Sequence, residues 1–222
     1  MLPLRDSQPS FSKPVVTVGI IVVNALVFLY QLSLDPFTRN DFSFAFGAVA
    51  DRLWWPSILT SMFLHGGWMH LIGNMLMLWV LGDNIEDILG HWKFLLFYLL
   101  CGVAACLAQV AVNPDSRVPM IGASGAIAGV MGAYLLKFPH AHIRTLVFLF
   151  IFITVVEIPA GVLLIYWLAL QFFSGFGSIV EAHANKGGTA WFAHIGGFLA
   201  GMALIKIFRS RDRYTWRRDI AW

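Results

Sequence analysis

Several polar side chains interrupt the long apolar runs of this sequence, and their types are those of an acyl-transfer site. They are Ser124, His194, and a group formed by His65, His70 and Asn74. Polar groups inside membrane spans are costly and tend to mark function. A serine hydroxyl is a weak nucleophile that needs an adjacent base, and histidine suits that role near neutral pH. The set therefore indicates a serine nucleophile with a histidine base.

Acyl transfer also needs hydrogen-bond donors that point at the developing oxyanion. Ser124 is expected near the start of a helix, where unpaired backbone N–H groups are found. The side chains of Asn74 and His70 are further candidate donors. Because no Asp or Glu is expected at the same depth, a Ser124–His194 dyad fits better than a full triad.

The surrounding sequence has the composition of a membrane protein. Hydrophobic residues make up 59% of the 222 residues and charged residues 12%, whereas soluble domains carry about 25% charged residues. Six runs lack Asp, Glu, Lys and Arg, and a chain in lipid must satisfy its own backbone, so each run is predicted to be a helix. The runs are Val15–Leu34, Ile58–Gly82, Phe94–Val112, Val118–Leu136, Ile158–Val180 and Gly187–Ile205. The expected fold is therefore an all-α bundle of six transmembrane helices.

The distribution of cations predicts that both termini are cytoplasmic, because that orientation places most of the 15 Lys and Arg residues inside. The net charge of +3 then reflects flanking cations and does not indicate nucleic-acid binding. We expect a short segment 1–13, one membrane domain 14–208 and a basic tail 209–222. Residues 143–156 are short for a span and are expected at the inner interface or packed on the bundle.

A depth estimate predicts that the polar residues meet. Ser124, His70 and His194 each lie about 12 or 13 residues before a charged residue at the inner end of their run, or roughly 18–20 Å at the rise of a helix. Gly125 and Gly129 in one run, and Gly197 and Gly201 in another, form small-xxx-small faces that allow close helix packing. A serine in a glycine-rich span is more often a packing residue, but the shared depth favours chemistry.

Three separated motifs resemble those of the rhomboid family of intramembrane serine proteases. They are His65-xxxx-His70-xxx-Asn74, Gly122-Ala123-Ser124-Gly125 and Ala193-His194-xx-Gly197-xxx-Gly201. The resemblance implies that Ser124 is the nucleophile, that His194 is the general base, and that no cofactor or metal is needed. It implies an oxyanion hole made by His70, Asn74, Gly122 and the Ser124 backbone, with His65 and Glu86 as supporting residues.

The same resemblance implies the biological setting. Substrates would be transmembrane segments of other membrane proteins, cut near the outer face, and the expected location is a bacterial plasma membrane. The alternative is a non-catalytic scaffold of the same fold, but inactive relatives typically lack the serine or the histidine. A transporter or metal site using the histidines would need a continuous polar path, which the sequence does not supply.

Two positions differ from the pattern of many relatives. An aromatic residue often follows the serine by four positions and supports the histidine ring, whereas here that residue is Ala128. We therefore expect an aromatic residue from the run 158–180, or Trp191 or Phe192, to hold His194. The loop before the second run has Trp54-Trp55-Pro56-Ser57 in place of a Trp-Arg pair.

Overall fold

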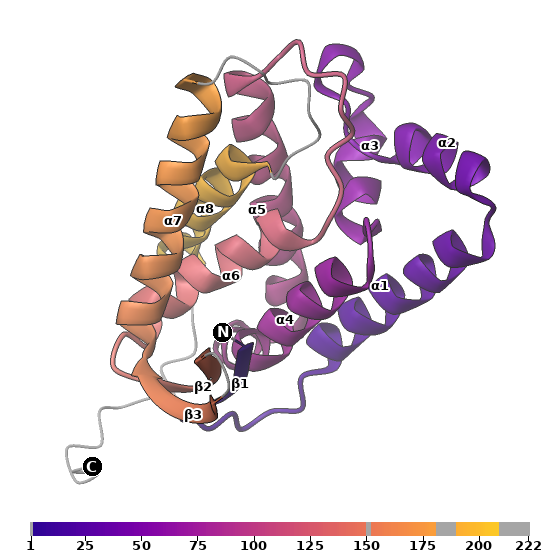
Figure 1. Cartoon of the computed structure of the whole chain (residues 1–222). Helices are drawn as coiled ribbons and strands as arrows, with labels where there is room; N and C mark the ends of the chain where they lie inside the picture. The colour runs from indigo at the N-terminus through magenta and orange to yellow at the C-terminus, as the bar shows by residue number, and fades with distance from the viewer. Residues whose placement is uncertain (1, 150–151, 181–189, 209–222) are drawn as a thin grey trace, which may run out of the picture.

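The computed structural model describes residues 2–149, 152–180 and 190–208, which form a helical bundle with a small sheet at one end (Figure 1). Within these ranges six helices have 14 or more residues. They are α1 (Val15–Ser33), α4 (Trp68–Leu89), α5 (His91–Val112), α6 (Ser124–Lys137), α7 (Ala160–Val180) and α8 (Trp191–Ile207). Shorter elements between α1 and α4 are α2 (Pro36–Phe46), η1 (Ala50–Arg52), α3 (Trp55–Thr60) and η2 (Ser61–Phe63).

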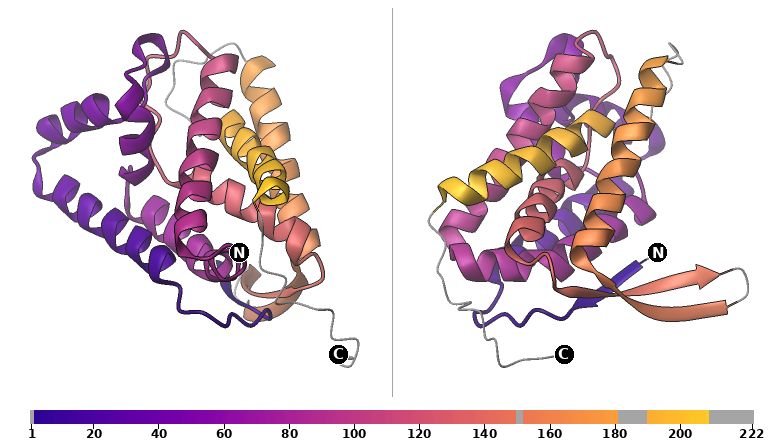
Figure 2. Two further views of the ribbon diagram at one scale, coloured as in Figure 1. Left: turned by 180° about the vertical axis from the view of Figure 1, so that it is seen from behind. Right: turned by 90° about the vertical axis from the view of Figure 1, so that its left-hand side faces the viewer.

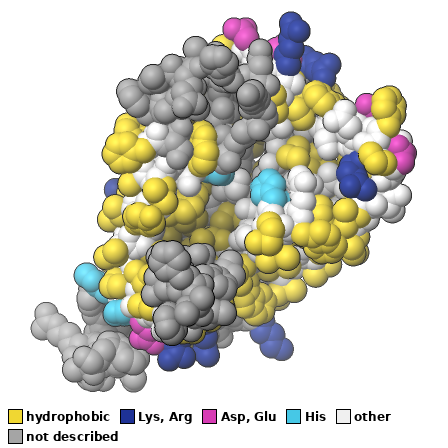
Figure 3. Space-filling view, viewed as in Figure 1, with side chains coloured by type: hydrophobic (Ala, Val, Ile, Leu, Met, Phe, Trp, Pro, Cys, Tyr) yellow, Lys and Arg dark blue, Asp and Glu magenta, His cyan; other side chains and the backbone are white. Residues whose placement is uncertain are grey.

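Two of the described helices, α1 and α5, are both long enough and apolar enough to cross a membrane by composition alone. The helices α7 and α8 contain shorter apolar stretches. Hydrophobic side chains cover much of the described part of the face seen in Figure 3, and most of the charged ones lie near its edges. Such an exposed apolar surface is typical of a protein in contact with lipid or partners.

Two helices begin later than the sequence predicted. The runs were expected to be helical from Ile58 and Val118, but α4 begins at Trp68 and α6 at Ser124. The backbone just before α6 is not helical and is hydrogen bonded to distant segments. Met120 pairs with Ala48, and Gly122 N–H donates to the Ser61 carbonyl at 2.9 Å. Non-helical backbone at membrane depth is tolerated where protein surrounds it, and composition does not reveal such places.

The prediction of a helical fold is confirmed, but one part differs from an all-α bundle: three antiparallel strands form a sheet in the order β1-β2-β3. Strands β2 (His142–Leu149) and β3 (Phe152–Pro159) take up the segment 143–156 whose placement the sequence left open. The segment is rich in β-branched and aromatic residues, which favour strands. Figure 2 shows the two strands as a long arm that extends beyond the helices.

The N-terminal segment packs against this end of the bundle. Strand β1 (Leu2–Asp6) pairs with β2, and the Asp6 carboxylate accepts a hydrogen bond from the hydroxyl of Tyr134 on α6. Burial raises the pKa of Asp6 to about 6. Ser12 donates to Asp87 on α4 at 2.5 Å. The segment 1–13 is therefore joined to the membrane domain in its described part, while the tail 209–222 lies outside the described residues.

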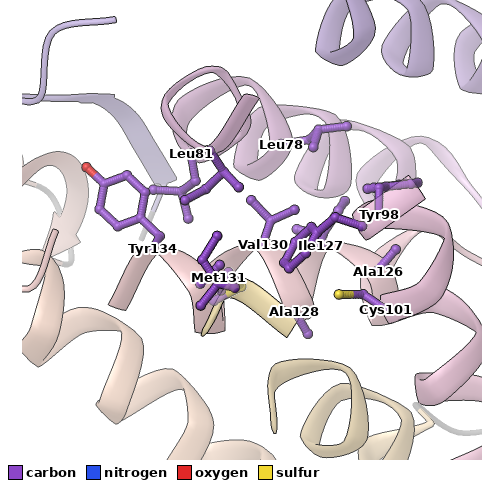
Figure 4. Packing of buried hydrophobic residues seen from close by; sticks show 14 of the residues in the cluster. Leu78, Leu81, Tyr98, Cys101, Ala126, Ile127, Ala128, Val130, Met131 and Tyr134 are labelled. Carbon is purple, nitrogen blue, oxygen red and sulfur yellow. The ribbon is translucent and has the colours of Figure 1, made fainter. Parts of the chain in front are cut away.

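The hydrophobic core lies where α4, α5 and α6 meet (Figure 4). Leu78 and Leu81 of α4, Tyr98 of α5 and Ile127 of α6 are at most 2% exposed. Because α6 is buried along nearly its whole length, it contacts protein and very little lipid. A helix of 14 residues is about 21 Å long and is shorter than a hydrocarbon core of about 30 Å. Its first residue, Ser124, therefore lies within the bundle.

Candidate active site

Two closely packed helices position the serine and histidine. Ser124 is the first residue of α6, and His194 lies in the first turn of α8. The helices approach at their glycines: a Cβ added at Gly197 would overlap the carbonyl of Gly125, and one added at Gly201 would overlap backbone atoms of Gly129. Only glycine allows the two backbones to be this close, so these glycines set the distance between the two side chains.

The side chains of Ser124 and His194 are hydrogen bonded. Ser124 Oγ lies 2.8 Å from His194 Nε2. The imidazole is 7% exposed, and the serine is half-buried. A hydroxyl within hydrogen-bond reach of an imidazole is the arrangement of a nucleophile and its general base.

The opposite side of the imidazole contacts α7 and its own helix. The indole ring of Trp167 lies 5.5 Å from the His194 ring, and the Trp191 ring lies 6.5 Å from it. Gln171 Oε1 is 2.7 Å from His194 Nδ1. The expected aromatic neighbours from α7 and from Trp191 are thus in place, and Ala128 itself is fully buried.

Two glutamines of the site were missed at the level of sequence. Gln171 is 7% exposed in an otherwise apolar helix. Gln109 on α5 accepts hydrogen bonds from Phe192 N and Ala193 N at 3.0 and 3.2 Å, which caps the start of α8 beside His194. Their only signal in the sequence is a neutral amide within an apolar run.

The candidate oxyanion donors gather around Gly122. This residue has φ +121°, and a Cβ added there would lie 2.7 Å from His70 Nε2 and 3.7 Å from Asn74 Nδ2. The first helical hydrogen bond of α6 runs from Ile127 N to the Ala123 carbonyl. The backbone N–H of Ser124 consequently lies outside the helical ladder. Glycine at this position leaves the space that the His70 ring and the Asn74 amide border.

Neighbouring groups orient both of these side chains. The N–H of Gly66 donates to His70 Nδ1 at 3.4 Å, so a neutral His70 carries its proton on Nε2, the atom beside Gly122. Asn74 Nδ2 lies 3.0 Å from His65 Nε2. The rings of His65 and His70 are in edge-to-face contact at 5.0 Å. His65, which is 2% exposed, therefore supports the pair from behind.

Glu86 lies away from this cluster, at the far end of α4, and is fully buried. Its carboxylate accepts hydrogen bonds from Val16 N and Thr17 N at 2.8 and 2.7 Å, at the first turn of α1. It also lies 2.5 Å from Nδ1 of His91, the first residue of α5. A carboxylate at a helix N-terminus is favourable, and this one joins three helices.

The comparison with protein families decides the identity, since the model of the rhomboid domain matches residues 51–211. The chain belongs to the rhomboid family. The match confirms the resemblance carried by the three motifs, and it means that this rhomboid is an integral membrane protein of a family that includes serine proteases.

Curated relatives of this rhomboid occur in bacteria and in mitochondria. It is 32% identical over 197 residues to "Rhomboid protease GluP" of Bacillus subtilis, and the matched region covers 85% of this chain and 34% of the relative. It is 32% identical over 151 residues to "Rhomboid protein 1, mitochondrial" of Saccharomyces cerevisiae, and the matched region covers 66% of this chain and 40% of the relative. The chain thus spans between a third and two fifths of the length of these two relatives.

Proposed function

We propose that this rhomboid is a serine endopeptidase that cleaves transmembrane segments of other membrane proteins with Ser124 and His194. The observation that carries the proposal is the 2.8 Å hydrogen bond between Ser124 Oγ and His194 Nε2. In this mechanism, Ser124 Oγ attacks the scissile carbonyl carbon while its proton moves to His194 Nε2. His194 then protonates the leaving amine, and water, activated in the same way, hydrolyses the acyl-enzyme.

The oxyanion of the tetrahedral intermediate would be held beside Gly122. Its donors would be His70 Nε2–H, the Asn74 amide and the Ser124 backbone N–H. Donors already fixed in a water-poor site stabilise the developing charge without reorganisation. Here His65 and Gly66 hold the side chains of Asn74 and His70 before any substrate arrives.

We further propose that α1, α4, α5, α6, α7 and α8 make up a six-helix membrane domain with both termini in the cytoplasm. The cation distribution supports this orientation. With both termini in the cytoplasm, Ser124 would lie toward the outer face, where substrates would be cut. A bacterial plasma membrane is the proposed location. The similarity to the Bacillus protein, which extends over 85% of this chain, supports it.

The test uses the purified full chain and a single-span model substrate with small residues near its outer end. Wild-type protein should cleave the substrate, and a serine-directed phosphonate should label Ser124 as located by mass spectrometry. Ser124→Ala should lose both cleavage and labelling while keeping its melting temperature. Substrate binding without cleavage by the wild type would instead support the non-catalytic scaffold.

Asn74→Ala is expected to slow turnover by about 10²–10³-fold, because it removes one donor to the oxyanion. The variant should remain folded, with a loss of about 1–3 kcal/mol from the unpaired His65 nitrogen. Asn24→Ala is the matched control, since Asn24 is a fully buried asparagine on α1 whose amide donates to the nearby Ile20 carbonyl. Equal turnover in the two variants would leave Asn74 with a packing role only.

A further inference from the structure

The base of the proposed dyad has a second polar neighbour on a helix that carries neither Ser124 nor His194. Gln171 on α7 is 7% exposed, and its side-chain oxygen lies 2.7 Å from His194 Nδ1. Serine proteases with a triad place a carboxylate opposite this nitrogen. Here an uncharged amide occupies the corresponding side of the ring.

The chemistry of an amide oxygen decides how this contact is made. It carries lone pairs and no hydrogen, so it can only accept. His194 Nδ1 must then be the donor, and a neutral imidazole with its proton on Nδ1 has a free lone pair on Nε2. The Nε2 atom is the one that lies 2.8 Å from Ser124 Oγ. The contact with Gln171 thus selects the tautomer in which Nε2 accepts the serine proton.

The opposite tautomer is disfavoured at Nδ1 and unproductive at Nε2. With the proton on Nε2, the Nδ1 lone pair would face the lone pairs of Gln171 Oε1 across 2.7 Å. The ring would also donate to Ser124 and would be unable to take its proton. Without an acceptor at position 171, nothing described on that side of the ring would distinguish the two tautomers.

The location of Gln171 explains why an amide suits this role. An ionised carboxylate inside a membrane domain is costly, whereas an amide accepts the hydrogen bond without carrying a charge. It can still stabilise the imidazolium that forms when His194 takes the serine proton, because Nδ1–H keeps its acceptor. Trp167, one turn before Gln171 on the same helix face, contacts the ring as well. Helix α7 therefore holds the imidazole with both a ring and a hydrogen bond.

We propose that Gln171 is a positioning residue that fixes the orientation and tautomer of His194 through the hydrogen bond to Nδ1. The role rests on the proposed function of Ser124 and His194. It also gives α7 a part in the reaction: the acceptor for the base comes from a helix different from the one that bears the nucleophile.

The test measures the rate at which a small phosphonate labels Ser124, because this rate reports serine activation without requiring a protein substrate. Gln171→Leu removes the acceptor at similar size and should slow labelling about 10- to 100-fold, less than the roughly 10⁴-fold loss in proteases locked in the wrong tautomer. Gln171→Glu keeps an acceptor oxygen in either protonation state and should label within a few-fold of wild type. With a cleavable substrate, Gln171→Leu should lower kcat and leave KM unchanged.

The control is Phe172→Leu, at the next position of α7, where the side chain is 55% exposed and is expected to leave labelling unchanged. Gln171→Met, which is unbranched like glutamine, carries the same test if the leucine variant does not fold. Equal rates for wild type and Gln171→Leu would overturn the positioning role, as would a Gln171→Glu variant as slow as the leucine variant. A wild type that is not labelled at Ser124 would instead reject the proposed function.

Discussion

Replacement of His194 by alanine is expected to lower the rates of substrate cleavage and Ser124 labelling by about 10⁴-fold or more. The hydroxyl of Ser124 would lose the group 2.8 Å away that accepts its proton, and an unassisted hydroxyl is a poor nucleophile at neutral pH. Among the described residues, no other side chain is hydrogen bonded to Ser124 Oγ. The measurement is the single-turnover rate with a single-span substrate, together with the labelling rate.

Leu199→Ala is the matched control, because Leu199 is on the same helix with its side chain 55% exposed. It should cleave at the wild-type rate. If His194→Ala retained more than about a tenth of the wild-type rate, another base would be required and the dyad assignment would be wrong. His194→Ala should melt at a somewhat lower temperature, because Gln171 Oε1 loses its partner. It should still unfold in one cooperative transition, which separates the loss of chemistry from a loss of folding.

Gly201→Ala is expected to have the largest effect on stability. Its Cβ would overlap the carbonyl oxygen, carbonyl carbon and Cα of Gly129 on α6. These are backbone atoms, so relief requires the two helices to separate. Overpacking usually costs about 1–3 kcal/mol, and a backbone clash is expected at the upper end of that range or beyond. Because α6 and α8 carry Ser124 and His194, their separation should also abolish activity.

Gly19→Ala provides the comparison for this variant. Gly19 lies within α1, where an added Cβ would meet nothing within 4 Å. Alanine there should preserve activity and leave the melting temperature equal or slightly higher, since alanine is a better helix former than glycine. Thermal unfolding of both variants in detergent measures the difference. Equal melting temperatures would mean that α6 and α8 are not held together as closely as the structure has them.

The fold could be predicted from the sequence only in part. Six apolar runs correspond to the six longer helices of the described residues, because a membrane requires apolar side chains and helical backbone. Segment 143–156 was not predicted as a hairpin, since its two strands pair with each other and the first of them with residues 2–6, and such pairing is not visible in composition. The late start of α6 was also missed, because residues 118–123 bond to distant backbone, namely Ala48 and Ser61.

The candidate site divides in a similar way. Histidine, serine and asparagine inside apolar runs were conspicuous in the sequence, because each is costly in lipid. Their shared depth was predicted from the helical rise together with the charged residues at the inner ends of the runs. A glutamine in the same setting is a weaker signal, although Gln171 and Gln109 both contact the helix turn that bears His194.

By itself, the sequence determined the chemical types available: a serine, a set of histidines, an amide, and the glycines that permit close helices. Hydropathy constrains one helix at a time, so it predicts depth but not which side chains of different helices meet. Only the tertiary structure decided which side chains face each other. It directed Ser124 Oγ at His194 Nε2 and brought Gln171 from α7 to Nδ1. The physical reason is that a hydrogen bond forms only when donor and acceptor are placed to within a few tenths of an ångström. Here that placement is set by the backbone contacts of Gly197 and Gly201 with a helix some 70 residues away in sequence.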